Sequence, residues 1–394
     1  MRLQAKSPHR PIRGAGSQHA AMRRSNENTI LALLLHTPDL PGSVIAKRTG
    51  LAPQTVSVLL RKLETEGLIL RREALRGKRG QPAVPFRLNP DAGYVIGIEI
   101  GWRHADFVLL DFAGGVTPGA RITYPYPHPD RLVADTIDGI EHLRAEVARR
   151  DVRILGIAQT GPAGLAERAF VLGASDEESR RLAEIDLTAE IERRTGLPVT
   201  FSNDGASALW AEAVFGRVPR DRDCAYVYLS TFIGSALYVD GRVLGDKGMN
   251  AARIGAAMTR ETDGSIGVLH MTASLWALAR FLASRGHAGP QQDFTRLDWQ
   301  AAEKDIADWL DQAAGDLALA CANTSAIVGV SVIVMDGILP RPLLARVVNA
   351  IQARINALPI EIFATPIVHL GQGGPSAPAI GAAYQVFHAR YFET

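Results

Sequence analysis

Apolar residues near the start of the chain recur every three or four positions, which is the period of an amphipathic helix. A leucine-rich segment at residues 26–35 predicts one helix, and Pro38 ends it. Residues 43–64 (SVIAKRTGLAPQTVSVLLRKLE) predict two more helices with a tight corner between them. Gly50 lies where the first of these must stop, and Pro53 suits the first turn of the second. The pattern therefore predicts a group of three helices.

After these helices the apolar pattern becomes that of β-strands. Residues 66–70 and 84–88 predict an antiparallel pair, and Asn89-Pro90-Asp91 then favours a domain boundary. Further along, strands are predicted at residues 94–101, 105–111, 121–126, 154–159 and 198–202, with helices at 132–150 and 187–195. A second series after residue 204 predicts strands at 224–229, 235–239, 242–244, 331–335 and 366–370, and helices at 275–285, 299–324, 342–356 and 377–391. Two series of similar organisation predict a duplicated α/β domain with a central cleft, where a ligand would bind.

The second helix of residues 43–64 has a polar outer face. Gln54, Thr55, Ser57 and Arg61 point away from its apolar positions and include no acidic residue. Such a face suits a recognition helix in the major groove, with Gln54, Thr55 and Ser57 at base edges and Arg61 at phosphate or guanine. Because any small helical pair can show a similar pattern, the face by itself leaves DNA binding open.

The connection between the first two predicted strands is strongly basic, with five Lys or Arg residues between positions 71 and 79. A basic hairpin behind two such helices is typical of a DNA-binding wing, and its Arg-Gly-Gln-Pro segment is thin enough for a minor groove. We therefore predict minor-groove contacts by Arg79 and Gln81. A solvated basic loop is the alternative.

Net charge divides the 394-residue chain into two parts. Residues 1–90 contain 16 Lys and Arg against 5 Asp and Glu, whereas the remainder contains 27 against 36. A basic segment joined to an acidic larger one indicates a nucleic-acid-binding module attached to a second domain. Residues 1–22 have no continuous apolar core and predict a disordered basic arm rather than a secretory signal.

Localisation follows from two further features of the sequence. No apolar run reaches the roughly 18 residues of a membrane span. Two cysteines, Cys224 and Cys321, are too few for a disulfide framework and fit a reducing cytoplasm. We therefore expect a cytoplasmic protein without a membrane segment.

Several short motifs occur in the order typical of one family. They are residues 50–57 (GLAPQTVS), 80–82 (GQP), 94–101 (YVIGIEIG), 203–204 (ND) and 381–383 (GAA). Together they resemble the ROK family (repressors, open reading frames and kinases), specifically its sugar-responsive repressors. The resemblance covers nearly everything from residue 26 onward. It implies a winged helix-turn-helix followed by an actin-like, ribonuclease-H-like double domain shared with sugar kinases.

In the family's kinases two glycine-rich loops hold the phosphates of ATP, and both are altered here. The first, Asp-x-Gly-Gly-Thr, corresponds to residues 99–103 (EIGWR), where Trp102 brings a bulky indole. The second, Gly-Thr-Gly-x-Gly, corresponds to residues 230–234 (STFIG). Phosphates need closely spaced backbone N–H groups, which Phe232 and Ile233 make less available. The comparison therefore implies a protein that is not an enzyme and needs no cofactor.

The resemblance also implies a set of effector contacts in the cleft. Asp204 matches the family's catalytic base and Asn203 the neighbouring ligand of a sugar hydroxyl. A carboxylate beside a carboxamide can hold a vicinal diol by paired hydrogen bonds. An Asn-Asp turn or helix cap is the alternative. Gly161, in the glycine-rich turn after the strand predicted at 154–159, completes this set.

Other effector positions depart from the family. Its Gly-Glu-Ile-Gly-His motif reads ARIGA at residues 252–256, so that Arg253 replaces the glutamate and the histidine is lost. Its cysteine-rich zinc segment would fall at residues 261–270, which contain no cysteine, and its last glutamate aligns with His270. We therefore expect no metal. Arg253, with His270, suggests a sugar acid or sugar phosphate as effector; an ion pair of Arg253 with Asp204 or another acidic residue is the alternative.

These observations predict a transcriptional regulator, a repressor of carbohydrate uptake or catabolism genes, that binds operator DNA as a homodimer or homotetramer and a sugar derivative in its cleft. The predicted domains are an arm (1–22), a winged helix-turn-helix (23–90) and an effector-binding and oligomerisation domain (91–394), with halves at about 91–203 plus the C-terminal helix and 204–376. Two alternatives remain. One is a sugar kinase that keeps Asp204 as catalytic base, and the other is a DNA binder that needs no effector.

Overall fold

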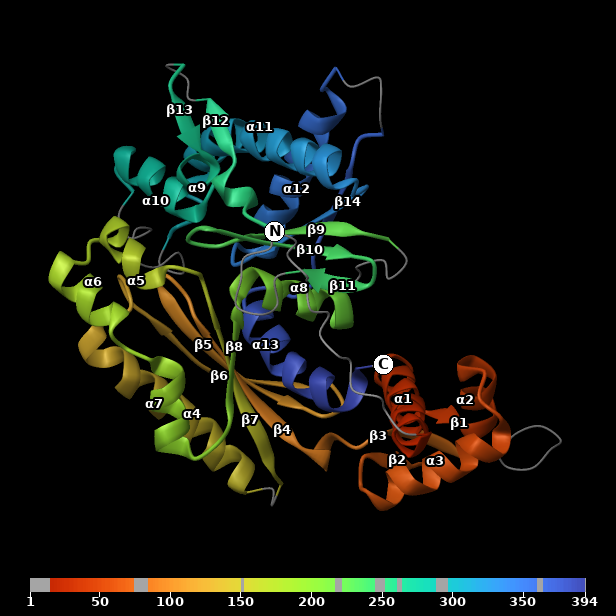
Figure 1. The fold of residues 1–394 in the computed structure, drawn as a ribbon. Coiled ribbons are helices and arrows are strands. Elements are labelled where there is room, and N and C mark those ends of the chain that lie inside the picture. The colour runs from red at the N-terminus through yellow and green to blue at the C-terminus, as the bar shows by residue number, and fades with distance from the viewer. Residues whose placement is uncertain are drawn as a thin grey trace, which may run out of the picture. The chain divides into compact units, whose positions relative to one another are not determined.

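A computed structural model describes residues 15–73, 84–149, 152–216, 222–244, 252–260, 264–287, 297–359 and 364–393 (Figure 1). Contacts within the chain define two compact units. The first consists of Met1–Ala92 together with His388–Thr394, and the second of Gly93–Phe387. The residues after Phe387, which we assigned to the larger domain from the sequence, thus pack with the first unit.

The first unit contains three helices and a three-stranded antiparallel sheet. The helices are α1 (Ala15–His36), α2 (Gly42–Thr49) and α3 (Pro53–Thr65). The strands are β1 (Leu40–Pro41), β2 (Ile69–Arg71) and β3 (Pro85–Leu88), in the order β1-β3-β2. Apolar side chains from all three helices form its core, among them Ile30, Leu34, Ile45, Val56 and Leu63. This arrangement is the predicted winged helix-turn-helix.

The corner between α2 and α3 has the backbone that the sequence predicts. Gly50 ends α2 with a φ of 71°, the left-handed conformation that glycine adopts without strain. Pro53 begins α3, and the N-cap residue Ala52 provides no side-chain hydrogen bond. At the back of α3, Lys62 pairs with Glu27 of α1 at 2.7 Å. Helix α1 therefore supports α3 from behind.

Residues from the far end of the sequence complete the first unit. The π-helix η5 (His388–Phe392) contacts α1. The buried side-chain amide of Asn28 on α1 donates a hydrogen bond to the carbonyl of Glu393. The first unit is therefore discontinuous in sequence.

The second unit contains two five-stranded sheets with the same plan. The first is built from β4 (Tyr94–Ile100), β5 (His104–Asp111), β6 (Val116–Thr123), β7 (Ile154–Gly161) and β8 (Val199–Asn203), in the order β6-β5-β4-β7-β8. The second is built from β9 (Cys224–Leu229), β10 (Ile233–Val239), β11 (Arg242–Leu244), β14 (Val332–Gly337) and β15 (Ile367–Leu370), in the order β11-β10-β9-β14-β15. In each sheet three antiparallel strands are followed by two parallel ones. The duplicated α/β fold is thus confirmed.

Helices cover both sheets and connect them (Figure 1). Helices α4 (Pro129–Ala148) and α7 (Leu187–Thr195) pack on the first sheet, and α10 (Leu275–Ser284), α11 (Glu303–Val328) and α12 (Arg341–Asn356) form the core beside the second. Helix α13 (Ala377–Phe387) packs on β4, β5 and β7, and α8 (Asp204–Phe215) packs on β9 and β10. The two helices cross closely, because a Cβ at Gly381 would lie 1.7 Å from the carbonyl oxygen of Ser207. The α8–α13 pair therefore joins the two sheets.

A few predicted elements were misplaced or missed. The strand expected at residues 121–126 is β6 at Val116–Thr123, because Asp111 accepts hydrogen bonds from the N–H groups of Ala113 and Gly115 and closes a tight turn just before it. The last helix, expected at residues 377–391, is α13 as far as Phe387 and continues as the π-helix η5. Helix α8 was missed, because its alanine-rich sequence is buried on nearly all sides and has no polar face to reveal its period. Within the described ranges no helix is long and apolar enough to cross a membrane.

Candidate functional site

The outer face of α3 presents the side chains that the sequence singled out. Gln54, Thr55, Ser57 and Arg61 are all exposed, whereas the core positions of the helix, Val56, Leu59, Leu60 and Leu63, are buried. The Ser57 hydroxyl donates to the carbonyl of Pro53, and the Arg61 Nε donates to the carbonyl of Ser57. Gln54 and Thr55, near the start of the helix, have the freest side chains for base edges. The other two predicted DNA contacts, Arg79 and Gln81, lie outside the described residues.

One apolar residue lies on this polar face. Val58 is 49% exposed in the middle of α3, between the predicted contacts Ser57 and Arg61. A methyl-bearing side chain on a recognition helix can contact the methyl group of thymine. Sequence reasoning missed Val58, because a valine on a helix is ordinarily assigned to the core.

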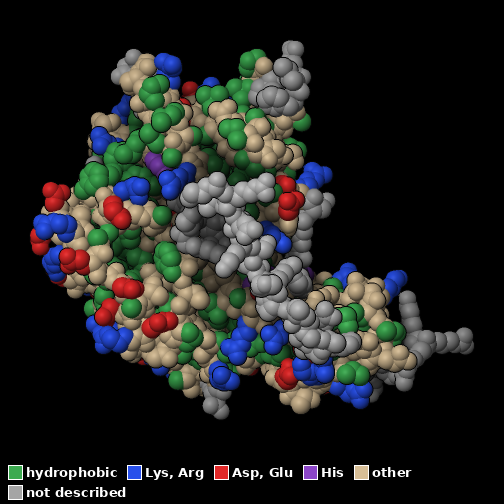
Figure 2. All heavy atoms as spheres, viewed as in Figure 1, with side chains coloured by type: hydrophobic (Ala, Val, Ile, Leu, Met, Phe, Trp, Pro, Cys, Tyr) green, Lys and Arg blue, Asp and Glu red, His purple; other side chains and the backbone are tan. Residues whose placement is uncertain are grey.

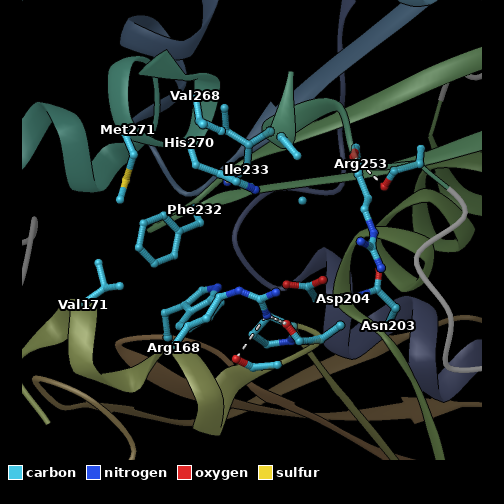
Figure 3. A pocket seen from close by; sticks show the side chains of 18 of the residues that line it. Arg168, Val171, Asn203, Asp204, Phe232, Ile233, Arg253, Val268, His270 and Met271 are labelled. Carbon is cyan, nitrogen blue, oxygen red and sulfur yellow. Dashed lines mark hydrogen bonds between the residues drawn. The ribbon is translucent and has the colours of Figure 1, made fainter. Parts of the chain in front are cut away.

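A cavity of about 630 Å³ lies in the second unit and is lined by residues of both halves (Figure 3). The first half contributes Trp102 and residues around Pro162–Gly164, Arg168, Val171 and Asn203, and Asp204 lies at the boundary between the halves. The second half contributes residues around Phe232–Ser235, Ala252, Arg253, Ala256, Val268, His270 and Met271. Four of the five predicted effector residues are therefore brought together. The fifth, Gly161, ends β7 against the carbonyl of Ile100 and does not line the cavity itself, although the next three residues do.

Asn203 and Asp204 form the buried floor of this cavity. Asn203 is the N-cap of α8, and its Oδ1 accepts hydrogen bonds from the N–H groups of Gly205 (3.1 Å) and Ala206 (3.3 Å). Asp204 Oδ1 accepts from Gly205 N–H at 2.7 Å. Asn203 is thus a helix cap, one of the alternatives that the sequence left open, and it faces the cavity as well.

The Asp204 carboxyl has an unusual protonation equilibrium. Burial, and secondly the nearby charge of Glu99, raise its pKa to about 7, although the backbone N–H of Gly205 opposes the change. Near neutral pH Asp204 is therefore present both as a carboxylic acid, which can donate a hydrogen bond, and as a carboxylate, which accepts one.

His270 is held as a neutral imidazole. Its Nδ1 accepts a hydrogen bond from the backbone N–H of Ile233 at 3.2 Å, and burial lowers its pKa to about 4. The other ring nitrogen then carries the proton and is a donor. His270 can contribute a neutral hydrogen bond to a ligand, but not the positive charge suggested by its pairing with Arg253 in the sequence.

Two arginines line the cavity. Arg253, predicted from the sequence, makes no ion pair with Asp204. The nitrogen atoms of its side chain lie more than 4.0 Å from the carboxylate oxygens of Asp204, and Arg253 is not among the causes of the shift in the pKa of Asp204. Arg168, which the sequence did not indicate, ends the short helix α5 (Leu165–Arg168) on the opposite half. Its only sequence signal is its place shortly after the glycine-rich turn at residues 160–164.

The positions of the two kinase phosphate loops are occupied by aromatic rings. Trp102 follows β4 and Phe232 precedes β10, and their rings contact each other with centroids 4.9 Å apart. Both rings also line the cavity, so bulky side chains stand at the two segments that the sequence comparison aligned with phosphate loops.

A third glycine-rich segment, residues 371–374 (GQGG), is a structural turn. The N–H groups of Gln372 and Gly373 donate to Glu212 Oε2 at 2.6 and 3.0 Å, and that of Gly374 donates to Asp336 Oδ2 at 2.8 Å. Carboxylates of the protein thus occupy the N–H groups that a nucleotide loop would offer to phosphate. Elsewhere, in the part of the chain that the structure describes, no three His, Cys, Asp or Glu side chains are grouped to hold a metal ion.

Comparison of the sequence with protein families agrees with this architecture. Residues 95–388 match the ROK family, and residues 23–69 match the winged helix-turn-helix DNA-binding family. The first match covers well over half of the chain. This protein therefore belongs to the ROK family.

Individual relatives are distant. The xylose repressor of Bacillus subtilis is 23% identical over 222 residues, which is 56% of this chain and 57% of that repressor, so the match spans little more than half of its length. A crystal structure described as a ROK family transcriptional regulator, a homolog of the E. coli MLC protein, has a TM-score of 0.64 at 20% identity and covers 93% of this chain and 97% of its own. The ROK glucokinase of Streptomyces griseus, in complex with glucose and AMPPNP, has a TM-score of 0.57 at 20% identity and covers 74% and 99%. At such identities these structures show the shared fold alone.

Proposed function

We propose that this protein is a DNA-binding transcriptional regulator, a repressor of carbohydrate uptake or catabolism genes, controlled by a sugar derivative in the cleft. One observation carries the proposal. The same chain combines the exposed polar face of α3 with a cavity that keeps Asn203 and Asp204 but fills the phosphate positions with Trp102 and Phe232. The names of two relatives, a xylose repressor and a ROK transcriptional regulator, support it.

DNA recognition follows from the chemistry of α3. The amide of Gln54 can bond an adenine edge through paired hydrogen bonds, Thr55 offers a hydroxyl, and Val58 offers methyl groups to thymine. Arg61 supplies charge for phosphate or guanine. A homodimer or homotetramer would place two such helices one turn of DNA apart on a palindromic operator.

Effector control follows from the position of the cavity between the two halves. The paired polar groups of Asn203 and Asp204 suit adjacent sugar hydroxyls, and the residues of the opposite wall would close over the bound ligand. Since Asn203 and Asp204 begin α8, ligand binding acts directly on the helix that joins the two sheets. Closure of the halves around an effector would change the spacing of the DNA-binding modules in the oligomer.

The proposal is tested by fluorescence anisotropy with DNA from upstream of this gene and its neighbours, at one fixed salt concentration because phosphate contacts make affinity salt-dependent. Titrations are repeated with a panel of sugars, sugar acids and sugar phosphates. Specific binding that one compound shifts is the expected result. The absence of specific binding to any of these sequences would contradict the proposal, and specific binding that no compound shifts would favour a DNA binder that needs no effector.

A second candidate function, sugar phosphorylation, is favoured by the pKa of about 7 at Asp204, because a general base works best when its pKa is near the operating pH. It requires ATP to enter loops that Trp102 and Phe232 fill. Release of ADP is measured with the same sugar panel, for the wild type and for Asp204→Asn. Saturable, sugar-dependent ADP release that Asp204→Asn abolishes would establish a kinase in place of a non-enzymatic regulator.

A further inference from the structure

The cavity between the two halves carries two positive charges on facing walls. Arg168 comes from α5 of the first half, and Arg253 comes from the second half, directly before the 3-10 helix η3 (Ile254–Ala256). Within the described ranges, no carboxylate oxygen lies within 4.0 Å of either guanidinium group. Figure 2 shows basic side chains and a histidine gathered between the parts of the surface that α5 and the helix α9 (Leu269–Thr272) form. Neither charge is therefore neutralised by a carboxylate of the described residues.

Local hydrogen bonds position both arginines. Arg168 Nη1 donates to the carbonyls of Ala163 (3.1 Å) and Gly164 (3.4 Å), which folds the side chain back over the glycine-rich turn. A single hydroxyl, that of Ser235, donates to the carbonyl of Ala252 and accepts from the N–H of Ile254, both at 3.1 Å. Ser235 thus fixes the backbone on each side of Arg253. Since a guanidinium has five N–H donors, most donors of both groups have no partner among the residues that the structure describes.

The remaining titratable groups of the cavity do not cancel these charges. His270 is neutral, because burial lowers its pKa to about 4. Asp204 lies on the buried floor and Glu167 is exposed at the edge, and both line the same cavity. Two full positive charges therefore face one exposed carboxylate and one carboxyl that is partly protonated near pH 7.

The polar floor of the cavity and its two arginines differ in their exposure to solvent. Asn203 and Asp204 are buried at the floor, with 3% and 7% of their surfaces exposed, whereas Arg168 and Arg253 are exposed at the mouth. Val171, Phe232 and Ile233 also line the cavity and give it an apolar side (Figure 3). The volume of about 630 Å³ is in the range of pockets for a single small ligand, roughly 300–1,000 Å³.

We infer that the effector of the proposed regulator is an anionic sugar derivative, whose hydroxyl groups bind Asn203 and Asp204 and whose carboxylate or phosphate lies at the mouth between Arg168 and Arg253. Guanidinium groups bind both anions through paired, charge-assisted hydrogen bonds. This inference rests on the proposed function and adds to it the chemical class of the ligand and a role for Arg168.

Isothermal titration calorimetry on the full chain tests the inference with matched neutral and anionic compounds. The panel contains two series, each with a neutral sugar, its acid and its phosphate: glucose, gluconate and glucose 6-phosphate, and xylose, xylonate and xylose 5-phosphate. Binding of a carboxylate and binding of a phosphate are thus measured separately. At least one anion is expected to bind about tenfold or more tightly than its neutral parent. Arg168→Gln and Arg253→Gln are each expected to lower the affinity for that anion by about tenfold or more. The affinity for the neutral sugar should change little. Arg193→Gln, an exposed arginine on α7 outside the cavity, is the control and is expected to bind as the wild type does.

Three results would overturn the inference: a neutral parent that binds as well as its anions, anion binding that neither substitution weakens, or no anion in the panel that binds. Ligand-free operator binding, measured by anisotropy on the same proteins, separates this failure from failure of the proposed function. Intact operator binding without a preference for anions would contradict this inference and leave the proposed function standing. A preference for anions without operator binding removes the regulatory function and leaves the ligand site.

Discussion

The indole of Trp102 meets the ring of Phe232 edge to face, with the ring planes at 87°. Trp102 belongs to the first half of the larger unit and Phe232 to the second, and less than a tenth of either residue is exposed. Phe232 also contacts the rings of His270 and Trp276. An aromatic cluster therefore joins the two halves at the two segments that the sequence comparison aligned with kinase phosphate loops.

The Trp102–Phe232 contact is expected to appear as a coupling energy. Either alanine substitution should lower the free energy of unfolding of the larger unit by about 3 kcal/mol, because a large buried ring is lost. The double variant should lose about 1 kcal/mol less than the sum, since an edge-to-face pair contributes roughly 0.5–1.5 kcal/mol beyond its buried area. Urea denaturation followed by circular dichroism measures all four proteins.

Trp102→Ala combined with Trp309→Ala is the control for this cycle. Trp309 is buried on α11 in a different part of the core. The loss in the free energy of unfolding caused by Trp309→Ala is expected to add to that caused by Trp102→Ala, with no coupling energy. Additive losses in the Trp102–Phe232 cycle would show that the two rings do not stabilise each other.

Substitutions on α3 are expected to separate base contacts from phosphate contacts. Gln54→Ala should weaken operator binding by about 1–3 kcal/mol and leave binding to unrelated DNA unchanged, because it removes hydrogen bonds to a base. Arg61→Ala should weaken both and reduce the slope of log affinity against log salt by about one, if its guanidinium neutralises a phosphate. Anisotropy titrations at several salt concentrations measure these effects. Equal loss on operator and unrelated DNA for Gln54→Ala would contradict the assignment of Gln54.

The N-terminus of α3 can be stabilised. Ala52 is the N-cap residue, with φ -59° and ψ 138°, and is exposed, but it has no side-chain oxygen. Ala52→Ser is therefore expected to raise the free energy of unfolding of the first unit by about 1 kcal/mol, because its hydroxyl can accept a hydrogen bond from an N–H group of the first turn. Thermal denaturation by calorimetry measures the gain. Ala52→Val, which adds a side chain without an acceptor, should give none, and equal gains from both would refute the capping explanation.

Asp204 is expected to make stability depend on pH. Its folded-state pKa of about 7 lies above the ordinary value of 3.8, so the folded protein keeps a proton that the unfolded chain releases. Stability is therefore lost progressively as pH rises from about 4 to 7, and the loss is complete above 7. Asp204→Asn carries no charge to bury. It should match the wild type near pH 4 and exceed it above pH 7, by at most of order 4 kcal/mol.

Urea denaturation at half-unit steps from pH 4 to 8 measures this difference. Asp138→Asn, an exposed position on α4, is the matched control and should show no such trend. A difference between Asp204→Asn and the wild type that does not change with pH would mean that Asp204 is ionised throughout in the folded protein.

Local patterns in the sequence account for most of the fold, whereas contacts between distant residues do not follow from them. Gly50 and Pro53 mark the helix-turn-helix corner because their backbone preferences act locally. The bulk of Trp102 and Phe232 is evident in the sequence, but nothing there indicates that two residues in different halves touch. Arg168 lies in a helix of four residues, which is too short to show a period. Its place in the effector cavity becomes apparent only when the two halves are assembled.

The discontinuity of the first unit has a consequence for its biosynthesis. Residues 388–393 pack with a unit whose other described residues, 15–73 and 84–92, are translated before residues 93–387. At roughly 5–20 residues per second, the ribosome needs about 15 to 60 s to translate the intervening residues 93–387. During that time helix α1 lacks its contacts with η5 and the hydrogen bond from Asn28 to Glu393. The first unit therefore reaches its final packing only after the ribosome has translated the second unit.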